Sequence, residues 1–324
     1  MPIRNATAGL ALAAILALAS SAAAQTYPTR PVRVVVPFAP GGITDILARA
    51  LGHRLGEALG QQIVVENRAG ANSQVGTELV ARAAPDGYTL LVSADTTFVM
   101  NPHLYGRAAQ DAVADLVPVS GLGISPQALV VHPSVPARSV ADLVALARAK
   151  PGELNYGTFG VGSSGHLNIE LMQAITGARF TAVHYKGAAP ALTDLIGGHI
   201  QMMIVSIGLV TQAWQAGQLA VLGFGSATRI APFADVPTIA ETLPGFEAAS
   251  WYGLAAPAGT PRPIVDRLSG ETQRIFAEQG FREKFLAPNM IFSIASPPEQ
   301  FAARIRADYA KWGKVIRDAN VKVE

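Results

Sequence analysis

Short apolar runs alternate with longer segments of helical periodicity along most of the chain, a pattern typical of βα units in a parallel sheet. The first unit has a buried strand over 32–36, a Gly-rich loop, and a helix that Thr44 or Asp45 is expected to cap and Gly60 to end. Further strands are predicted at 62–66, 88–92, 129–131, 154–157, 181–185, 200–205, 220–225 and 251–257, and helices at 76–83, 141–149, 167–176, 190–196 and before 216. The alternation predicts an α/β fold.

The order of these elements predicts two domains. Three helical patterns end the chain without strands of their own, so we expect them to pack back on the first domain. The chain then crosses between domains twice, near 124–131 and near 247–254, and the two crossing strands form a hinge beside a ligand cleft. The expected division is a signal peptide over 1–24, a discontinuous first domain over 25–124 and 252–324, and a second domain over 125–251.

The first residues have the layout of a cleavable secretory signal. Arg4 precedes an apolar run over 8–19, and small residues lead to a cleavage site expected after Ala24. The run is about a dozen residues long, whereas a helix that crosses a bilayer needs about 20. We therefore expect the mature protein in the periplasm, with a retained anchor as the alternative.

Composition excludes several classes of function. The chain has 25 basic and 23 acidic side chains, a formal charge of +2, so it lacks the basic surface that nucleic-acid binding requires. Cysteine is absent, which excludes disulfides, thiolate catalysis and cysteine-based metal sites. The six histidines show no metal-ligand spacing, and the sequence indicates no cofactor.

Two Gly-rich loops, one in each expected domain, share one design: each follows a buried strand and opens a helix. Unpaired N–H groups and the positive end of the helix dipole favour an anion at such a junction. If the domains face each other, the loops form two halves of one anion clamp; the alternative is that both are ordinary βα turns. Their candidate ligand residues are Phe38, Ala39, Gly41, Gly42, Thr44 and Asp45 in the first loop, and Gly162, Ser163, Ser164 and His166 in the second.

Enzymatic alternatives have weaker support. The loop over 160–165 matches G-x-G-x-x-G, which favours an NAD(P)-dependent oxidoreductase, but the next strand ends in His184-Tyr185-Lys186 without the carboxylate that holds the ribose. An exported hydrolase is the other alternative. Ser163 and Ser164 lack the G-x-S-x-G elbow, and His166 is favoured as a helix cap or ligand contact over a catalytic base.

Ordered motifs over nearly the whole chain resemble one family, the Bug (TctC-like) extracytoplasmic receptors of tripartite tricarboxylate transporters. The motifs are Arg33-Val34-Val35-Val36-Pro37-Phe38-Ala39-Pro40-Gly41-Gly42, Val65-Glu66-Asn67-Arg68, Ala84-Pro85-Asp86-Gly87-Tyr88, Tyr185-Lys186-Gly187, Asp235-Val236-Pro237-Thr238 and Trp251-Tyr252-Gly253.

The resemblance implies a two-domain type II periplasmic-binding-protein fold that closes on a small carboxylate and docks on membrane permease subunits. It implies a protein that is monomeric and not an enzyme; a sensor without transport remains an alternative. Besides the two loops, it adds as expected ligand-binding residues Ser93, Asp95, Thr96, Tyr185, Val205 and Ser206.

The sequence departs from the family pattern at three places. Ile43 replaces a small residue and should narrow the expected ligand cleft beside the first loop. Val205 and Ser206 stand where many relatives carry Asp and Asn. A valine cannot neutralise an ammonium group, so we expect a ligand without a buried amine: a di- or tricarboxylate, an aromatic acid or an uncharged small molecule. Asn72-Ser73-Gln74 replaces a glycine-rich stretch and does not by itself indicate a ligand.

Overall fold

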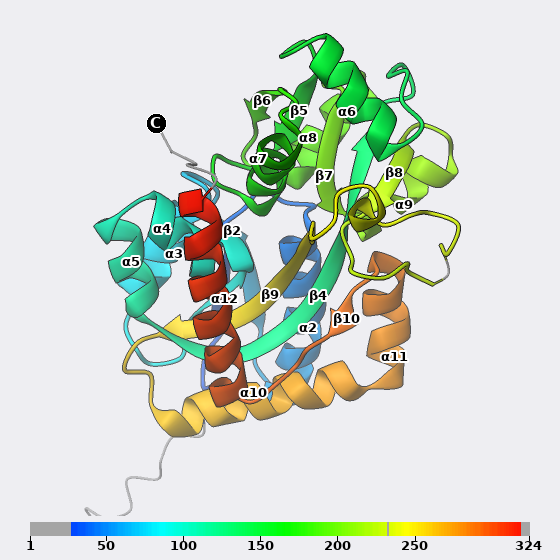
Figure 1. Ribbon diagram of the computed structural model, residues 1–324. Helices are drawn as coiled ribbons and strands as arrows, with labels where there is room; N and C mark the ends of the chain where they lie inside the picture. Colours follow the sequence, from blue (N-terminus) through cyan, green and yellow to red (C-terminus); the bar gives the residue numbers. More distant parts are fainter. Residues whose placement is uncertain (1–26, 232, 319–324) are drawn as a thin grey trace, which may run out of the picture.

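The structure is a computed structural model that describes residues 27–231 and 233–318. The expected signal peptide over 1–24 lies outside the described residues. Helices cover both faces of two β-sheets that share one long strand, so the fold is α/β, as the sequence predicts (Figure 1). Within the two described ranges, no helix combines the length and apolarity that a bilayer span requires.

The first sheet has the strand order β2-β1-β3-β9-β4. Val34 and Val36 on β1 pack in a core cluster with residues of α2 and α10, whereas Val35 packs in another cluster on the opposite face. Because both faces are buried, these strands form continuous apolar runs in the sequence. The strand bounds are β1 (Val32–Val36), β2 (Ile63–Asn67), β3 (Thr89–Ala94), β4 (Leu116–Val131), β9 (Ala249–Pro257) and the short β10 (Phe292–Ser293), which also pairs with β4.

The second sheet joins the end of β4 to four further strands. Met202 and Ile204 on β7 face one core cluster, and Met203 and Val205 face the other, so helices cover this sheet on both sides as well. The end of β4 pairs antiparallel with β7 and β8, while β5 pairs in parallel with β6 and β7. The bounds are β5 (Asn155–Thr158), β6 (Thr181–His184), β7 (Met202–Ser206) and β8 (Ala220–Phe224).

Each sheet has its own covering helices. On the first sheet, α12, red in Figure 1, lies beside β4, and Trp312 and Ile316 on this helix pack in one cluster with Val35. The helix bounds are α2 (Ile43–Leu59), α3 (Gln74–Ala81), η1 (Thr96–Met100), α4 (Asn101–Leu104), α5 (Arg107–Ala114), α6 (Val140–Ala149), α7 (Ser164–Thr176), α8 (Ala188–Ile196), α9 (Ile207–Gln215), η2 (Ile239–Glu241), α10 (Arg262–Ala277), α11 (Gln279–Phe281), η3 (Arg282–Leu286), η4 (Ala287–Asn289) and α12 (Pro298–Asp318).

Strand β4 changes partner between Pro126 and Gln127. Pro126 pairs with Ala249 of β9 in the first sheet, and Gln127 pairs with Ser206 of β7 in the second. We call the described residues before 127 and after 248 the first lobe, and residues 127–248 the second lobe. The domain boundaries expected from the sequence stay a prediction.

Two local features differ from the sequence-based expectation. Helix α2 has Gly42 as its N-cap without a side-chain cap bond, so capping by Thr44 or Asp45 is wrong; Gly60 ends the helix in the left-handed conformation, as expected. The sequence also indicated only the last residues of β4. Its first half contains Pro118 and two glycines, which hide the strand pattern, and irregularities in the pairing with β9 accommodate these residues.

Gly253 on β9 provides a test of this packing. A Cβ at Gly253 would lie 2.0 Å from the ring of Phe301 on α12, so Gly253→Ala should lower the free energy of unfolding by about 1–3 kcal/mol. The control is Gly270→Ala on α10, where a Cβ meets nothing within 4 Å and helix propensity favours alanine. Urea denaturation measures both, and an unchanged Gly253→Ala would contradict the packing.

Candidate functional site

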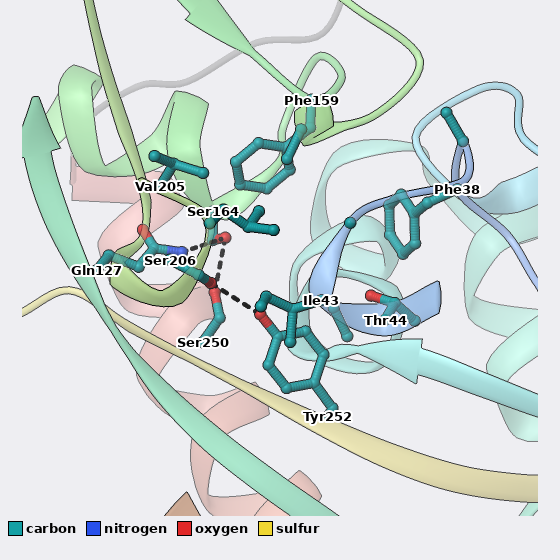
Figure 2. Close-up of a pocket in the computed structure, with 15 residues that line it drawn as sticks. Phe38, Ile43, Thr44, Gln127, Phe159, Ser164, Val205, Ser206, Ser250 and Tyr252 are labelled. Atoms are coloured by element: carbon teal, nitrogen blue, oxygen red, sulfur yellow. Dashed lines mark hydrogen bonds between the residues drawn. The ribbon is translucent and has the colours of Figure 1, made fainter. Parts of the chain in front are cut away.

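A pocket lies between the two lobes and is formed by both of them (Figure 2). Its volume is about 450 Å³ including the open mouth. Its walls come from the β1–α2 loop, the end of β3, the second half of β4, the first half of β9, the segments after β5 and β7, and the start of α8. The lining residues are Phe38, Ala39, Gly42, Ile43, Thr44, Ala94, Gln127, Phe159, Ser164, Ala188, Val205, Ser206, Leu209, Ser250 and Tyr252.

A buried amide and two hydroxyls form one polar wall. The Gln127 amide donates to Ser250 Oγ at 2.6 Å and to Ser164 Oγ at 3.1 Å, and the two hydroxyl oxygens are 2.9 Å apart. Asn168 donates to the Gln127 carbonyl oxygen at 2.9 Å, which orients the amide. Ser164 and Ser250 share one hydroxyl proton in their mutual bond, so the other remains free to face a ligand.

A second hydroxyl pair joins the lobes at the same pocket. Ser206 at the end of β7 and Tyr252 on β9 are 2.9 Å apart between their oxygens. Burial raises the pKa of Tyr252 well above its usual value, and the nearby Asp95 adds to the effect. The phenol therefore stays protonated at neutral pH, and this pair also retains one hydroxyl proton for a ligand.

The N-terminus of α2 lines the pocket with open donors. Gly42 offers no side-chain acceptor, so the first N–H groups of the helix, at Ile43 and Thr44, have no helical partner. The Thr44 side chain is 6% exposed and lines the pocket, and no hydrogen bond joins its hydroxyl to other described residues. Helix end and hydroxyl together form a site for a negatively charged oxygen.

The remaining walls are apolar. Phe38 comes from the first lobe and Phe159 from the second, and Leu209 on α9 adds to the same surface. None of the lining residues, taken from the described part of the chain, carries a charge. A ligand here is held by neutral donors and by apolar contact.

The structure brings seven of the expected ligand-binding residues to the lining of this pocket, and the others are not part of the lining. Those that line it are Phe38, Ala39, Gly42, Thr44, Ser164, Val205 and Ser206. Asp45 instead accepts hydrogen bonds from Gly41 N–H and from the side chains of Arg49 and Asn67. Although burial opposes it, these bonds hold the pKa of Asp45 below its usual range, so Asp45 shapes the loop as a fixed anion.

Ser93, Asp95 and Thr96 do not line the pocket and bond to neighbouring groups instead. Ser93 Oγ is 2.6 Å from Thr97 Oγ1, and Asp95 accepts a hydrogen bond from Thr96 N at 2.8 Å. Thr96 reaches the other lobe, because its hydroxyl accepts a hydrogen bond from Ser164 N at 3.2 Å. Burial raises the pKa of Asp95 to about 7, so this buried carboxyl near Tyr252 is partly protonated at neutral pH.

The loop before α7 is internally bonded. Ser163 is the N-cap and accepts from His166 N, while His166 Nδ1 accepts the Gly162 N–H at 2.9 Å. Burial, with some effect from His184, lowers the pKa of His166 to about 4, so the ring is neutral. Tyr185 donates its hydroxyl to Asp194 at 2.6 Å, within the second lobe.

The contacts of Ser164 and His166 do not fit the hydrolase alternative. Ser164 Oγ bonds to Gln127 and Ser250, and His166 Nδ1 is occupied by a backbone N–H, so the pair has no nucleophile–base arrangement. No group of three acidic or histidine side chains that could hold a metal ion occurs within residues 27–231 and 233–318.

The sequence analysis missed several residues of the pocket, among them Gln127, Phe159, Ser250 and Tyr252. Tyr252 stood in a recognised motif, which could have indicated it. Gln127 and Ser250 lie at the crossing between the lobes, where the strand pattern is broken. Phe159 had no signal, since an aromatic residue after a strand is commonly part of the core.

Two lobes that share a strand and enclose a pocket of neutral donors define a solute-binding receptor of the periplasmic type. The chain belongs to the tripartite tricarboxylate transporter receptor family, whose model matches residues 47–321. A relative is the protein BugT of Bordetella pertussis, 37% identical over 309 residues, which cover 95% of this chain and 94% of that protein.

Solved structures of similar proteins support the same assignment. The R. palustris protein Rpa4515 with adipate is 37% identical with a TM-score of 0.88, and the match covers 91% of this chain and 99% of that one. MatC from Rhodopseudomonas palustris with bound malate is 30% identical with a TM-score of 0.85, and the match covers 90% and 100% of the two chains. The periplasmic binding protein BugD is also 30% identical, with a TM-score of 0.87 and 92% and 100% coverage.

The buried carboxyl of Asp95 predicts a pH dependence of stability. Its folded pKa of about 7 lies above the unfolded value of about 4, so the folded state holds the extra proton and loses stability as pH rises between these values. Asp95→Asn removes this loss. The free energy of unfolding of the variant minus that of the natural protein should therefore rise from pH 5 to pH 8. The rise should be at most about 1.4 kcal/mol per pH unit.

The matched control is Asp142→Asn at the exposed start of α6, where hydrogen bonds lower the carboxyl pKa. That group is fully ionised from pH 5 to pH 8, so its effect on unfolding should not change over this range. Denaturation curves at several pH values measure both variants. A parallel pH profile for Asp95→Asn and the natural protein would refute the assignment.

Proposed function

We propose that this protein is a periplasmic receptor that captures a small carboxylate without an amine and delivers it to the permease subunits of a tripartite transporter, without chemical conversion. The observation that carries the proposal is the pocket between the lobes, lined by neutral donors from both of them. Membership in the receptor family supports the transport role and the periplasmic location.

One carboxylate fits the N-terminus of α2. The open N–H groups of Ile43 and Thr44 and the Thr44 hydroxyl converge there. A hydrogen bond to a charged group contributes about 1.5–3 kcal/mol, and a helix terminus adds about 0.3–1 kcal/mol. A few such bonds offset the cost of removing a carboxylate from water without any arginine.

The opposite end of the ligand fits the hydroxyl walls. The Ser164–Ser250 pair and the Ser206–Tyr252 pair each retain one proton, and both pairs join groups from the two lobes. An acceptor oxygen of the ligand, such as a second carboxylate, receives these donors. Such a ligand touches both lobes at once, so it binds the closed state better than the open one.

The walls also argue against an amino acid. A buried ammonium group needs a carboxylate or several acceptors, and the lining offers Val205 and other uncharged side chains instead. Phe38, Ile43 and Phe159 favour a hydrocarbon or aromatic body between the polar ends. The adipate and malate in the structures of Rpa4515 and MatC are ligands of the expected type.

Isothermal titration calorimetry with adipate, malate, benzoate, aspartate and glutamate tests the ligand class. An amine-free acid should bind at least about tenfold more tightly than either amino acid, because an unpaired buried charge costs more than one hydrogen bond returns. Tighter binding of glutamate or aspartate than of every amine-free acid would reject the proposal. Conversion of the bound acid, detected by mass spectrometry, would instead indicate an enzyme.

The Thr44→Val variant tests the carboxylate position. It removes one hydroxyl donor from the pocket and should weaken binding of the preferred acid about tenfold or more. Thr193→Val is the control, because the exposed Thr193 hydroxyl donates to Ala189 O within its own helix. The affinity of this variant for the acid should equal that of the natural protein. An unchanged affinity for Thr44→Val would place the carboxylate elsewhere.

A further inference from the structure

The lobes also touch each other directly, beside the ligand pocket. On the first lobe, Asn72, Leu104 and Tyr105 approach the second lobe, and we call these residues the knob. The loop residues that they approach on the second lobe, Gly160, Val161 and Gly162, we call the notch. Asn72, Tyr105, Gly160 and Val161 line a second, outer cavity of about 540 Å³ including its mouth, and Phe38 and Phe159 line this cavity as well as the ligand pocket.

The notch has room for the knob only because two of its residues are glycines. A Cβ at Gly160 would lie 2.8 Å from Asn72 Oδ1, and a Cβ at Gly162 would lie 2.4 Å from Leu104 Cδ1. Between them, Val161 O accepts a hydrogen bond of 2.6 Å from the Tyr105 hydroxyl. Both glycines also have positive φ, 138° and 75°, which favours glycine on conformational grounds. The glycines of the G-x-G-x-x-G match at 160 and 162 thus accommodate the other lobe.

The knob is held in place by contacts within its own lobe. Ala71, Asn72 and Ser73 have φ values of 43°, 47° and 78°, a run of left-handed residues that non-glycine side chains rarely adopt. Asn101 stabilises this turn, because it donates to Asn72 O at 2.5 Å and accepts from the Asn72 amide at 2.8 Å. A buried chain of hydroxyls from Ser73 through Thr97 to Ser93 continues the support.

We propose that the knob and notch form a latch that stabilises the closed receptor through contacts between the lobes alone, so that Tyr105 and Asn72 set the affinity for every ligand without touching it. This inference rests on the proposed function, because it concerns closure around the ligand of that same pocket. It also gives a role to the Asn72-Ser73-Gln74 segment: a glycine-rich turn would lack the Asn72 side chain that enters the notch.

The latch acts through the equilibrium between open and closed states. The apparent dissociation constant of a ligand that binds the closed state is its intrinsic value divided by the closed fraction. A contact made only between the lobes changes that fraction and multiplies the dissociation constant of every ligand by one common factor. A residue that touches the ligand changes different ligands by different factors.

Tyr105→Phe is the direct test, because it removes only the hydroxyl that reaches Val161 O. We expect weaker binding of adipate and of malate by the same factor, about 2- to 10-fold, the range of one net hydrogen bond. The matched control is Tyr27→Phe, which removes a hydroxyl that donates to Gly87 O, also at 2.6 Å, but within the first lobe. Its affinities should equal those of the natural protein. Unchanged affinities for Tyr105→Phe, or factors that differ between the two acids, would overturn the latch.

A second measurement does not depend on any ligand. The sequence has no cysteine, so cysteines introduced at the exposed Arg82 and Lys150, one on each lobe, can carry a fluorophore pair without competing labels. Without ligand, Tyr105→Phe should lower the fraction of molecules whose energy-transfer efficiency is that of the closed state, whereas Tyr27→Phe should leave this fraction unchanged. An equal closed fraction in both variants would reject the latch even if a carboxylate binds. A reduced closed fraction would support it even if no acid of the panel binds.

Discussion

The arrangement of the site depends on the change of partner within β4. At Gln127 the strand leaves β9 and pairs with β7, while its backbone N–H and C=O bond to Ala248 and Gly225. The side chain of the same residue bonds to Ser164 and Ser250 in the pocket wall. One residue therefore belongs both to the connection between the lobes and to the polar wall of the pocket.

The proposed acid needs no cation in the pocket because the donors there are held in place by the protein itself. Helix starts and hydroxyl pairs need no counter-charge of their own, and the apolar rings around them lower the local dielectric, which strengthens each bond. The titratable groups nearby serve this placement. Asp45 orders the β1–α2 loop, and His166 orders the turn before α7 as a neutral acceptor.

Glycine has different functions at the two loops that the sequence singled out. At Gly42 the absence of a side-chain cap leaves the first N–H groups of α2 open toward the pocket. At Gly160 and Gly162 the absence of a side chain makes room for the opposite lobe. The same residue type thus supports ligand binding on one side of the cleft and contact between the lobes on the other.

The sequence by itself determined the α/β fold, most strands and helices, the family and the first loop of the site, because these depend on local periodicity and contiguous motifs. It missed the first half of β4, where Pro118 and neighbouring glycines interrupt the pattern. It also expected Asp45, Asp95 and His166 at the ligand, and these residues do not line the pocket. Only the tertiary structure decided that Gln127, Phe159 and Ser250 meet Ser164 in one pocket, and that Asn72 faces Gly160. These residues are far apart in the chain, and they come together because two sheets share one strand. Local sequence patterns do not predict such an arrangement.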